Sequence, residues 1–243
     1  MTGSDSKISK DENGIGPMFD SIARRYDFLN HLLSFGVDRS WRRKTVQLIS
    51  EYCSEPRIID VATGTGDLAI EASRIGPAMI RGIDISERML ELARRKVDRK
   101  RLSGMIEFAR CDSENICFRD CTFDVAMVAF GVRNFSDPEK SLAEMRRVVK
   151  PGGLIVILEF SKPASFPFKQ AYNLYFKNLL PLIGRVFSKN RGAYRYLHDS
   201  VMKFADNEEF MAILKNAGFA NVRQMRLTSG VATIYSGIRQ VIQ

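Results

Sequence analysis

Short apolar runs alternate with longer stretches of helix-like periodicity along the middle of the chain. We predict a β-strand at each apolar run, at 57–62, 79–85, 105–111, 123–130 and 154–160. Helices are expected between the strands, at 67–74, at 86–100 with Ser86 as its N-cap, and from Asp137-Pro138 to the turn at 150–153. The run 123–130 is nearly all apolar, as in a central strand that is buried on both faces. Strands that alternate with helices indicate βαβ units and a parallel sheet.

The pattern indicates one domain over residues 17–243, preceded by a polar tail, 1–16, which we expect to be disordered. Two helices open this domain within residues 17–50, at 19–35 and 39–50. An insertion at about 161–205 is more than an alternating α/β core needs. No apolar stretch approaches the roughly 20 residues that cross a bilayer, and the tail lacks the apolar core of a secretory signal. The expected location is therefore the cytoplasm.

Beyond the insertion, the pattern predicts a helix and then two strands. The run Asp206–Glu209 has the form of a capping box at a helix start, and Gly218 suits the helix end. Strands are expected at 222–227 and 231–237, joined by a tight turn at Ser229-Gly230. We therefore expect a doubly wound, mostly parallel α/β sheet that ends in an antiparallel hairpin.

The chain is basic, with 37 Lys and Arg residues against 28 Asp and Glu residues and a formal net charge of +9. Such a charge attracts polyanions, either nucleic acid or anionic lipid. The basic residues are spread along the chain, so solvated helix faces explain them as well as a binding patch does. The four cysteines, Cys53, Cys111, Cys117 and Cys121, are expected to be unreactive, buried or half-buried thiols. With only two histidines in the chain, we expect no metal site.

A glycine-rich segment, Asp60-Val61-Ala62-Thr63-Gly64-Thr65-Gly66-Asp67, lies where the first strand meets the next helix. Glycines such as Gly64 and Gly66 let the backbone approach a ligand closely, and the spacing alone also fits a dinucleotide. A dinucleotide would place its diphosphate against Asp60 and Asp67, at a cost of about 3 kcal/mol per charge pair at roughly 5 Å. S-adenosylmethionine carries no phosphate, and its sulfonium and ammonium groups are attracted by acids. The segment therefore predicts S-adenosylmethionine as the cofactor.

Two further acids follow the next two strands. Asp84 ends the second strand, where a carboxylate can accept both ribose hydroxyls, and Asp112 follows the third, where it can accept from the adenine amino group. Each alone could be a helix cap or a solvated loop residue. With Asp60 they place an acid at the carboxyl end of three consecutive strands, where open α/β sheets bind their ligands. Together with the C-terminal hairpin, this arrangement is typical of class I methyltransferases.

Distinctive segments occur on either side of this core. They are Tyr26-Asp27-Phe28-Leu29-Asn30, Phe130-Gly131-Val132-Arg133-Asn134 and Arg147-Val148-Val149-Lys150-Pro151-Gly152-Gly153. On these segments the chain resembles the ubiquinone/menaquinone biosynthesis C-methyltransferases, from about Met18 to Gly237. The resemblance implies cofactor contacts at Thr65, Asp84, Asp112 and Ser113. Departures from the family pattern are Leu29 in place of Met, Asp38 in place of His, Ala62 in place of Gly, and Ala129, which is Ser in some members and which we leave out of the site.

The resemblance implies methylation of a ring carbon of a prenylated quinol, either demethylmenaquinol to menaquinol or the related benzoquinol step of ubiquinone synthesis. An enzyme of this kind should align the partners and stabilise oxyanion character on the ring. We predict that Arg133 stabilises a phenolate, that Asn134 orients the ring oxygen, and that Tyr26 is a third hydrogen-bonding partner. His31, a carboxylate or a water is the candidate acceptor for the ring proton.

Alternative interpretations of these residues and of the fold stay open. Arg133 could form a surface salt bridge, Tyr26 could be simple core packing, and Trp41 fits a core position better than a substrate stacker. A small-molecule O- or N-methyltransferase, or a non-catalytic scaffold with this fold, would share much of the pattern. No nucleic-acid partner is expected, since the fourth strand is not followed by an Asn/Asp-Pro-Pro-Tyr-like segment and no RNA-binding module is appended.

The insertion has the composition of an interfacial helix. Aromatic and aliphatic residues recur at near-helical spacing between basic residues such as Lys169, Lys177 and Arg185, and no acid occurs between Phe160 and Asp199. Such a segment could bind the surface of an anionic membrane, where a prenylated quinol resides, and could equally be a lid over the pocket. We therefore expect a cytoplasmic protein with peripheral contact to the inner face of the membrane, and the oligomeric state is left open.

Overall fold

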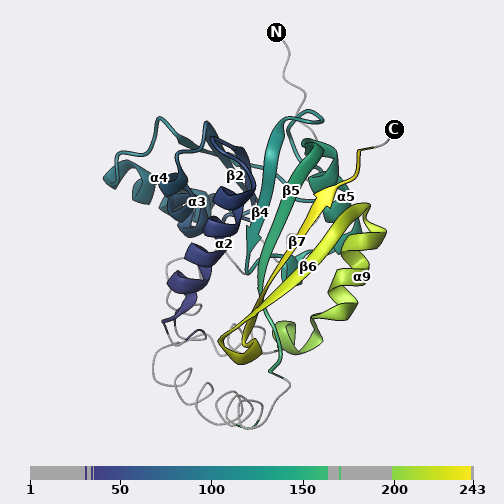
Figure 1. Cartoon of the computed structure of the whole chain (residues 1–243). Coiled ribbons are helices and arrows are strands. Elements are labelled where there is room, and N and C mark those ends of the chain that lie inside the picture. The colour runs from purple at the N-terminus through teal and green to yellow at the C-terminus, as the bar shows by residue number, and fades with distance from the viewer. Residues whose placement is uncertain (1–30, 32–33, 35, 164–169, 171–198, 242–243) are drawn as a thin grey trace.

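The computed structural model describes residues 31, 34, 36–163, 170 and 199–241. Its centre is a seven-stranded sheet with the order β3-β2-β1-β4-β5-β7-β6, in which β7 runs antiparallel to both of its neighbours and the first five strands are parallel (Figure 1). The strands are β1 (Arg57–Val61), β2 (Met79–Asp84), β3 (Ile106–Arg110), β4 (Phe123–Ala129), β5 (Val149–Phe160), β6 (Phe219–Leu227) and β7 (Ala232–Arg239). The predicted parallel sheet with an antiparallel hairpin at its edge is confirmed.

Helices cover both faces of this sheet. They are α2 (Asp38–Tyr52), α3 (Asp67–Ala72), α4 (Glu87–Arg99), α5 (Pro138–Val148) and α9 (Glu208–Asn216), with short 3-10 turns η1 (Ser73–Ile75), η2 (Val132–Asn134) and η4 (Thr228–Gly230). Alternate residues of a strand enter opposite cores, because successive side chains point to opposite faces. In β4, Val125 and Met127 pack with α2 and α3, whereas Ala126 and Val128 pack with α5 and α9. The predicted central strand is thus buried on both faces.

Two helix starts follow the predicted capping chemistry. The Ser86 hydroxyl accepts a hydrogen bond from the Met89 amide at 3.2 Å, which caps α4. The Asp137 carboxylate accepts from the Lys140 amide at 3.0 Å and precedes Pro138 at the first position of α5. Both caps could be read from the sequence because the contact spans only three residues.

Two local predictions are wrong. The residues 150–153 do not form a turn before the fifth strand, since β5 begins at Val149 and its pairing with β4 shifts register across this stretch. The capping box at α9 does not form either. Asn207 has a φ of +57° and no side-chain cap; its amide donates to the Tyr235 hydroxyl at 2.7 Å and its side chain accepts from Arg226 at 3.0 Å. Contacts with the hairpin have replaced the local cap.

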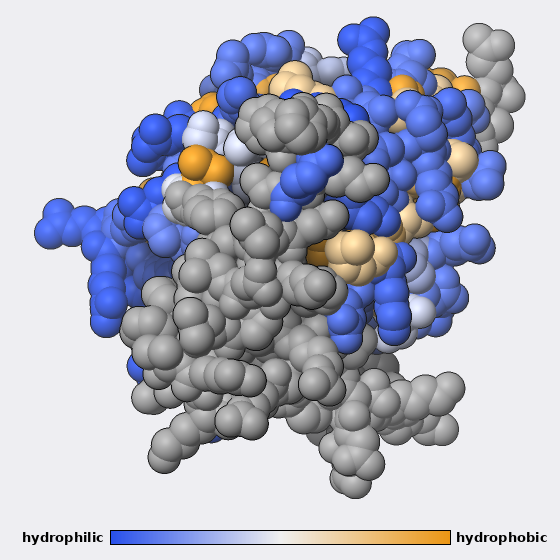
Figure 2. Space-filling view, turned by 90° about the horizontal axis from the view of Figure 1, so that it is seen from below, coloured by the Kyte–Doolittle hydropathy of each residue, from blue (hydrophilic) through white to orange (hydrophobic). Residues whose placement is uncertain are grey.

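Three predicted features lie mainly or wholly outside the described residues and stay predictions. They are the tail 1–16, the helix at 19–35 and most of the insertion at 161–205. Where side chains are described, the end of the molecule seen in Figure 2 is mainly hydrophilic, with a few hydrophobic residues scattered over it. In the described ranges, no helix is both long enough and apolar enough to cross a membrane.

Candidate active site

The loop between β1 and α3 crosses the carboxyl end of the sheet in an unusual backbone conformation. Ala62, Gly64 and Gly66 have φ values of +52°, +55° and +81°. A Cβ atom on Gly66 would lie 3.0 Å from the Phe108 ring and 3.2 Å from the Ala93 methyl group, so glycine is required there for the loop to pack against β3 and α4. Ala62 holds a left-handed conformation despite its side chain, at a cost of the order of 1 kcal/mol.

Asp60, at the end of β1, is a fully buried acid with one oxygen left without a hydrogen bond. The Thr63 hydroxyl donates to its Oδ2 atom at 2.6 Å, whereas no described group reaches Oδ1. Burial raises the pKa of Asp60 to about 7, and the charge of Asp84 adds to this; the hydrogen bonds from Thr63 and the Ala69 amide act in the opposite direction. A buried carboxyl with an unused oxygen fits a cationic ligand group, such as the ammonium of S-adenosylmethionine.

Asp84 shapes the same loop from the end of β2. Its Oδ2 atom accepts from the Gly64 amide at 2.8 Å, and its Oδ1 atom accepts from the Ser86 amide at 2.9 Å. An ionised carboxylate has about four acceptor positions, so one such group can bind several donors at once. The structure thus brings Asp84 to the glycine-rich loop, as predicted, and its contact with ribose stays a prediction.

The segment after β3 carries the predicted adenine contacts. Asp112 is exposed, and its Oδ1 atom accepts from the Glu114 amide at 2.9 Å. The Ser113 hydroxyl lies 3.1 Å from the Ser141 hydroxyl of α5. Both residues therefore lie at the same edge of the sheet as Asp84, in the position that the sequence predicted.

Two cysteines at the ends of this segment interact with each other. The Cys117 amide donates to the Cys111 sulfur at 2.8 Å. A hydrogen bond from the Cys111 thiol lowers the pKa of Cys117 to about 7 and raises the pKa of Cys111. All four cysteines are free thiols, but Cys117 and Cys121 are exposed, so the expectation of buried or half-buried thiols is wrong for these two.

Lys96 of α4 reaches across to the glycine-rich loop. Its ammonium donates to the Thr65 hydroxyl at 2.8 Å and to the Asp67 carboxylate at 2.6 Å. This contact neutralises part of the acidity of the loop and holds Thr65 in place. The sequence did not point to Lys96, because it is one of many basic residues on an amphipathic helix.

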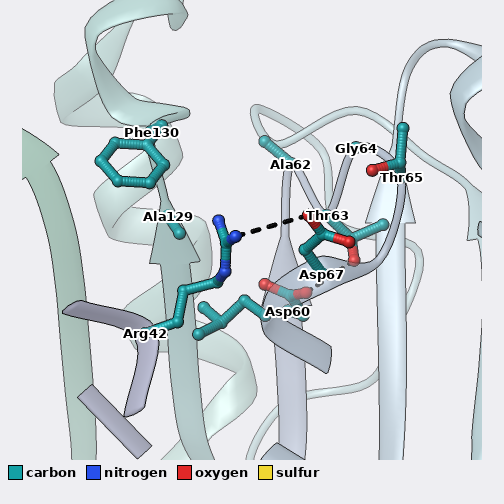
Figure 3. Close-up of a pocket in the computed structure, with 10 residues that line it drawn as sticks. Arg42, Asp60, Ala62, Thr63, Gly64, Thr65, Asp67, Ala129 and Phe130 are labelled. Atoms are coloured by element: carbon teal, nitrogen blue, oxygen red, sulfur yellow. Dashed lines mark hydrogen bonds and ion pairs between the residues drawn. The ribbon is translucent and has the colours of Figure 1, made fainter. Parts of the chain in front are cut away.

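An open pocket lies between this loop and the end of β4 (Figure 3). It is lined by Arg42, Asp60, Ala62, Thr63, Gly64, Thr65, Asp67, Leu68, Ala129 and Phe130. Arg42 comes from α2 and extends into the space between the loop and β4, with Asp67 opposite it (Figure 3). Ala129 lies in the wall of the pocket, although it is not among the predicted site residues.

Arg42 is held by a network that begins at the start of α2. Its Nη2 atom forms an ion pair with Asp38 and lies 3.5 Å from the Asp67 carboxylate. Asp38 also accepts from the Ser34 hydroxyl at 2.8 Å and lies 2.9 Å from Nδ1 of His31. Burial alone would raise the pKa of Asp38, but Arg42, Ser34 and His31 together hold it below its ordinary value. The departure from the family pattern at Asp38 thus supplies the carboxylate that orients Arg42.

Arg133 lies in the turn η2, directly after β4, with a side chain that is only 1% exposed. Its guanidinium lies 2.5 Å from Glu159 and donates to the Phe130 carbonyl at 2.8 Å. Asn134 donates to the same carbonyl at 3.4 Å. The predicted pair therefore lies next to Phe130, which lines the pocket. Arg133 does form an ion pair, but the pair is buried and not at the surface. Glu159 was missed, because a single acid inside an apolar strand gives no sign of its partner.

Aromatic rings form the wall behind the pocket. Phe130 stacks on Phe160 with centroids 4.5 Å apart, and Trp41 lies 6.3 Å and 6.0 Å from these two rings. Trp41 is 2% exposed and donates to the Thr228 hydroxyl at 2.8 Å, which confirms its predicted place in the core. Tyr26, the third predicted catalytic residue, lies outside the described residues. Within the part of the chain that the structure describes, no group of acids, histidines and cysteines could hold a metal ion.

The strand order, the glycine-rich loop and the acids at the carboxyl edge of the sheet define a class I methyltransferase that uses S-adenosylmethionine. Among solved structures, the [4+2]-cyclase SpnF has a TM-score of 0.68 at 17% identity and covers 94% of this chain and 96% of its own. A possible histamine N-methyltransferase from Thermotoga maritima has a TM-score of 0.65 at 20% identity, with 93% and 99% covered. At such identities these similarities concern the fold alone.

The chain belongs to the ubiE/COQ5 methyltransferase family, whose model matches residues 6–239. A relative from Geotalea daltonii, named ubiquinone/menaquinone biosynthesis C-methyltransferase UbiE, is 48% identical over 233 residues, which cover 95% of this chain and 98% of that protein. A relative from Bacteroides fragilis strain YCH46, named demethylmenaquinone methyltransferase, is 43% identical over 235 residues, which cover 96% of both chains. The predicted family resemblance is thus confirmed over nearly the whole chain.

Proposed function

We propose that this enzyme methylates a ring carbon of a prenylated quinol and converts demethylmenaquinol to menaquinol. The observation that carries the proposal is the similarity over nearly full length to a C-methyltransferase of quinone synthesis and to a demethylmenaquinone methyltransferase. Phe130 supports it, because this residue lines the pocket beside the cofactor loop and brings an aromatic ring there, backed by the ring of Phe160. C-methylation of the related benzoquinol in ubiquinone synthesis is the second candidate, favoured by the double name of the Geotalea relative.

The chemistry asks the protein mainly for alignment and charge stabilisation. Bound S-adenosylmethionine supplies an electrophilic methyl group. A ring carbon of the quinol forms the new C–C bond as the C–S bond breaks, and it then loses its proton. Electron density on that carbon rises as a ring hydroxyl loses or shares its own proton, so a donor that stabilises the resulting oxyanion accelerates the reaction.

We assign this stabilisation to the turn at the end of β4. Arg133 supplies the positive charge and Asn134 a side-chain amide, both placed beside the pocket by the Phe130 carbonyl. The ion pair with Glu159 holds the guanidinium in one orientation, so its side chain does not have to be ordered when the substrate binds. Tyr26 is the third proposed partner of the ring oxygens. His31, a carboxylate or a water takes the ring proton.

The test is a quinone profile of cells with and without this protein, together with an assay of the purified enzyme on both quinols. The proposal expects demethylmenaquinone to accumulate without the protein and turnover to be faster on demethylmenaquinol. Methylation of the benzoquinol alone would favour the second candidate. Cofactor binding with no turnover on either quinol or on small O- and N-acceptors would identify a non-catalytic scaffold.

We further propose that the enzyme works at the inner face of the membrane without crossing it. Its substrate carries a prenyl chain and resides in the bilayer. The basic and aromatic composition of residues 166–195, most of which lie outside the described ranges, supports contact with anionic lipid. Each basic residue near such a surface contributes about 1 kcal/mol.

A further inference from the structure

The two ends of the cofactor differ in chemistry, and so do the two sides of the glycine-rich loop. The predicted ribose and adenine partners, Asp84 and Asp112, lie at the end of β2 and after β3, on one side of β1 in the sheet order. The pocket lies on the other side of β1, against Ala129 and Phe130 at the end of β4. A cofactor whose adenosine lies over β2 and β3 must therefore direct its amino-acid end into this pocket.

That amino-acid end is a zwitterion, with an ammonium group and a carboxylate. The charged side chains that line the pocket are Arg42, Asp60 and Asp67. The buried carboxyl of Asp60, with its unused Oδ1 atom, matches the ammonium. Among the lining residues, only Arg42 offers a positive charge to the carboxylate, because Lys96 reaches the loop through Thr65 and Asp67 and does not line the pocket.

We propose that Arg42 binds the carboxylate of S-adenosylmethionine and thereby selects a cofactor with an intact amino-acid end. A guanidinium presents its five N–H donors in a planar fork that matches the two oxygens of a carboxylate. Arg42 extends from α2 into the pocket, between the end of β4 and the loop (Figure 3). No residue of the glycine-rich loop supplies this charge, so α2 completes the cofactor site.

The network around Arg42 prepares it for this role. Asp38 binds one side of the guanidinium and is itself held by Ser34 and His31, so the side chain is oriented before any ligand arrives. Asp67 is a looser partner, at 3.5 Å, and its other oxygen is taken up by Lys96 at 2.6 Å. Both acids meet the same Nη2 atom, so a ligand carboxylate can approach the Nη1 and Nε atoms of Arg42 without breaking the bond to Asp38.

The experiment measures two affinities on each protein by titration calorimetry, for S-adenosylmethionine and for decarboxylated S-adenosylmethionine, which lacks only the carboxylate. The wild type should bind the complete cofactor about 10- to 100-fold more tightly, as expected for a charge-assisted, two-pronged contact. In Arg42→Gln, affinity for the complete cofactor should fall by a similar factor, while affinity for the decarboxylated form changes less than about threefold. Arg42→Lys should lie between the two.

Arg43→Gln is the matched control, since Arg43 is the next residue of α2 but its side chain is 64% exposed and pairs with Glu71. Both affinities should stay at the wild-type values in this variant. If Arg42→Gln does not fold, Arg42→Gln with Asp38→Asn removes the uncompensated buried acid and is measured in its place. Equal losses for both ligands in either variant, or equal affinities of the wild type for both, would overturn the proposal. These binding data do not depend on which quinol is methylated.

Discussion

Arg133 and Glu159 form an ion pair that is almost completely enclosed, with side chains 1% and 0% exposed and a distance of 2.5 Å between Nη1 and Oε1. The same carboxylate accepts from the Phe160 amide at 2.9 Å. Removing one partner would leave the other charge buried and uncompensated. A simple alanine substitution at Arg133 therefore cannot separate a catalytic role from a structural one.

We expect Arg133→Ala to lower the free energy of unfolding by about 3–5 kcal/mol, or roughly 6–20 °C in Tm, because Glu159 loses its counter-charge. The double variant Arg133→Met with Glu159→Gln should recover most of this loss, since it buries no unpaired charge. Thermal unfolding followed by circular dichroism measures both. If the double variant is stable yet at least 100-fold slower at saturating quinol, Arg133 acts on the substrate. If the double variant recovers both stability and turnover, the role of Arg133 is only to stabilise the turn η2.

A second prediction concerns Asp84. Its carboxylate holds the Gly64 and Ser86 amides as well as the proposed ribose hydroxyls, so Asp84→Ala would also release the loop. Asp84→Asn keeps the size and one acceptor but loses the charge. We expect affinity for S-adenosylmethionine to fall about 10- to 100-fold in this variant, as measured by calorimetry. If the folded variant binds S-adenosylmethionine with wild-type affinity, Asp84 is not part of the ribose site.

Cofactor affinity should depend on pH through Asp60. Its pKa is raised to about 7, so the carboxyl is neutral below this pH and carries its charge only above it. If the ionised form receives the ammonium, affinity should rise as the pH increases from 6 to 8 and fall as the carboxyl is protonated, by up to tenfold per pH unit below the pKa. Asp60→Asn should lack this dependence and also corrects for titration of the ligand itself. The same slope in both proteins would contradict the assignment.

Cys117 should be the most readily alkylated of the cysteines whose pKa is shifted. The hydrogen bond from Cys111 lowers its pKa to about 7, so about half of it is thiolate at neutral pH, whereas burial raises the pKa of Cys53. We expect iodoacetamide labelling of Cys117, followed by mass spectrometry, to have its midpoint near pH 7. In Cys111→Ala the midpoint should move toward 9. An unchanged midpoint would show that Cys111 does not stabilise the thiolate.

The membrane proposal predicts co-sedimentation with anionic vesicles at low salt and weaker binding as salt is added. Replacement of Lys169, Lys177 and Arg185 by Gln should weaken binding, by about 1 kcal/mol per residue that lies near the surface. Neutral vesicles serve as the control. If the protein stays in the supernatant with anionic vesicles at low salt, the membrane proposal is wrong and the insertion is only a lid.

The strands and most helix starts could be predicted because their signals are local. An apolar run such as 123–130 defines its strand, and the Ser86 and Asp137 caps act over three residues. The wrong predictions come from contacts distant in sequence. Asn207 forms hydrogen bonds with Tyr235 and Arg226 in the hairpin, and no local sequence pattern predicts these contacts.

The same distinction holds in the site. Asp60, Asp84 and Asp112 could be found because parallel strands bring their carboxyl ends to one edge of the sheet. Arg42 and Glu159 could not, because Arg42 reaches the pocket only where α2 packs beside the glycine-rich loop, and Glu159 owes its role to Arg133 on another element.

The hydrogen bond from Trp41 to Thr228 joins residues that are 187 positions apart in the chain. At the usual rates of synthesis, Thr228 leaves the ribosome roughly 10 to 40 s after Trp41. The helix that carries Trp41 also carries Arg42, so this wall of the pocket is anchored to the hairpin region only after Thr228 has been synthesised. A ribosome-stalled fragment that ends before the hairpin should therefore fail to retain the cofactor, although it already contains every acid of the site.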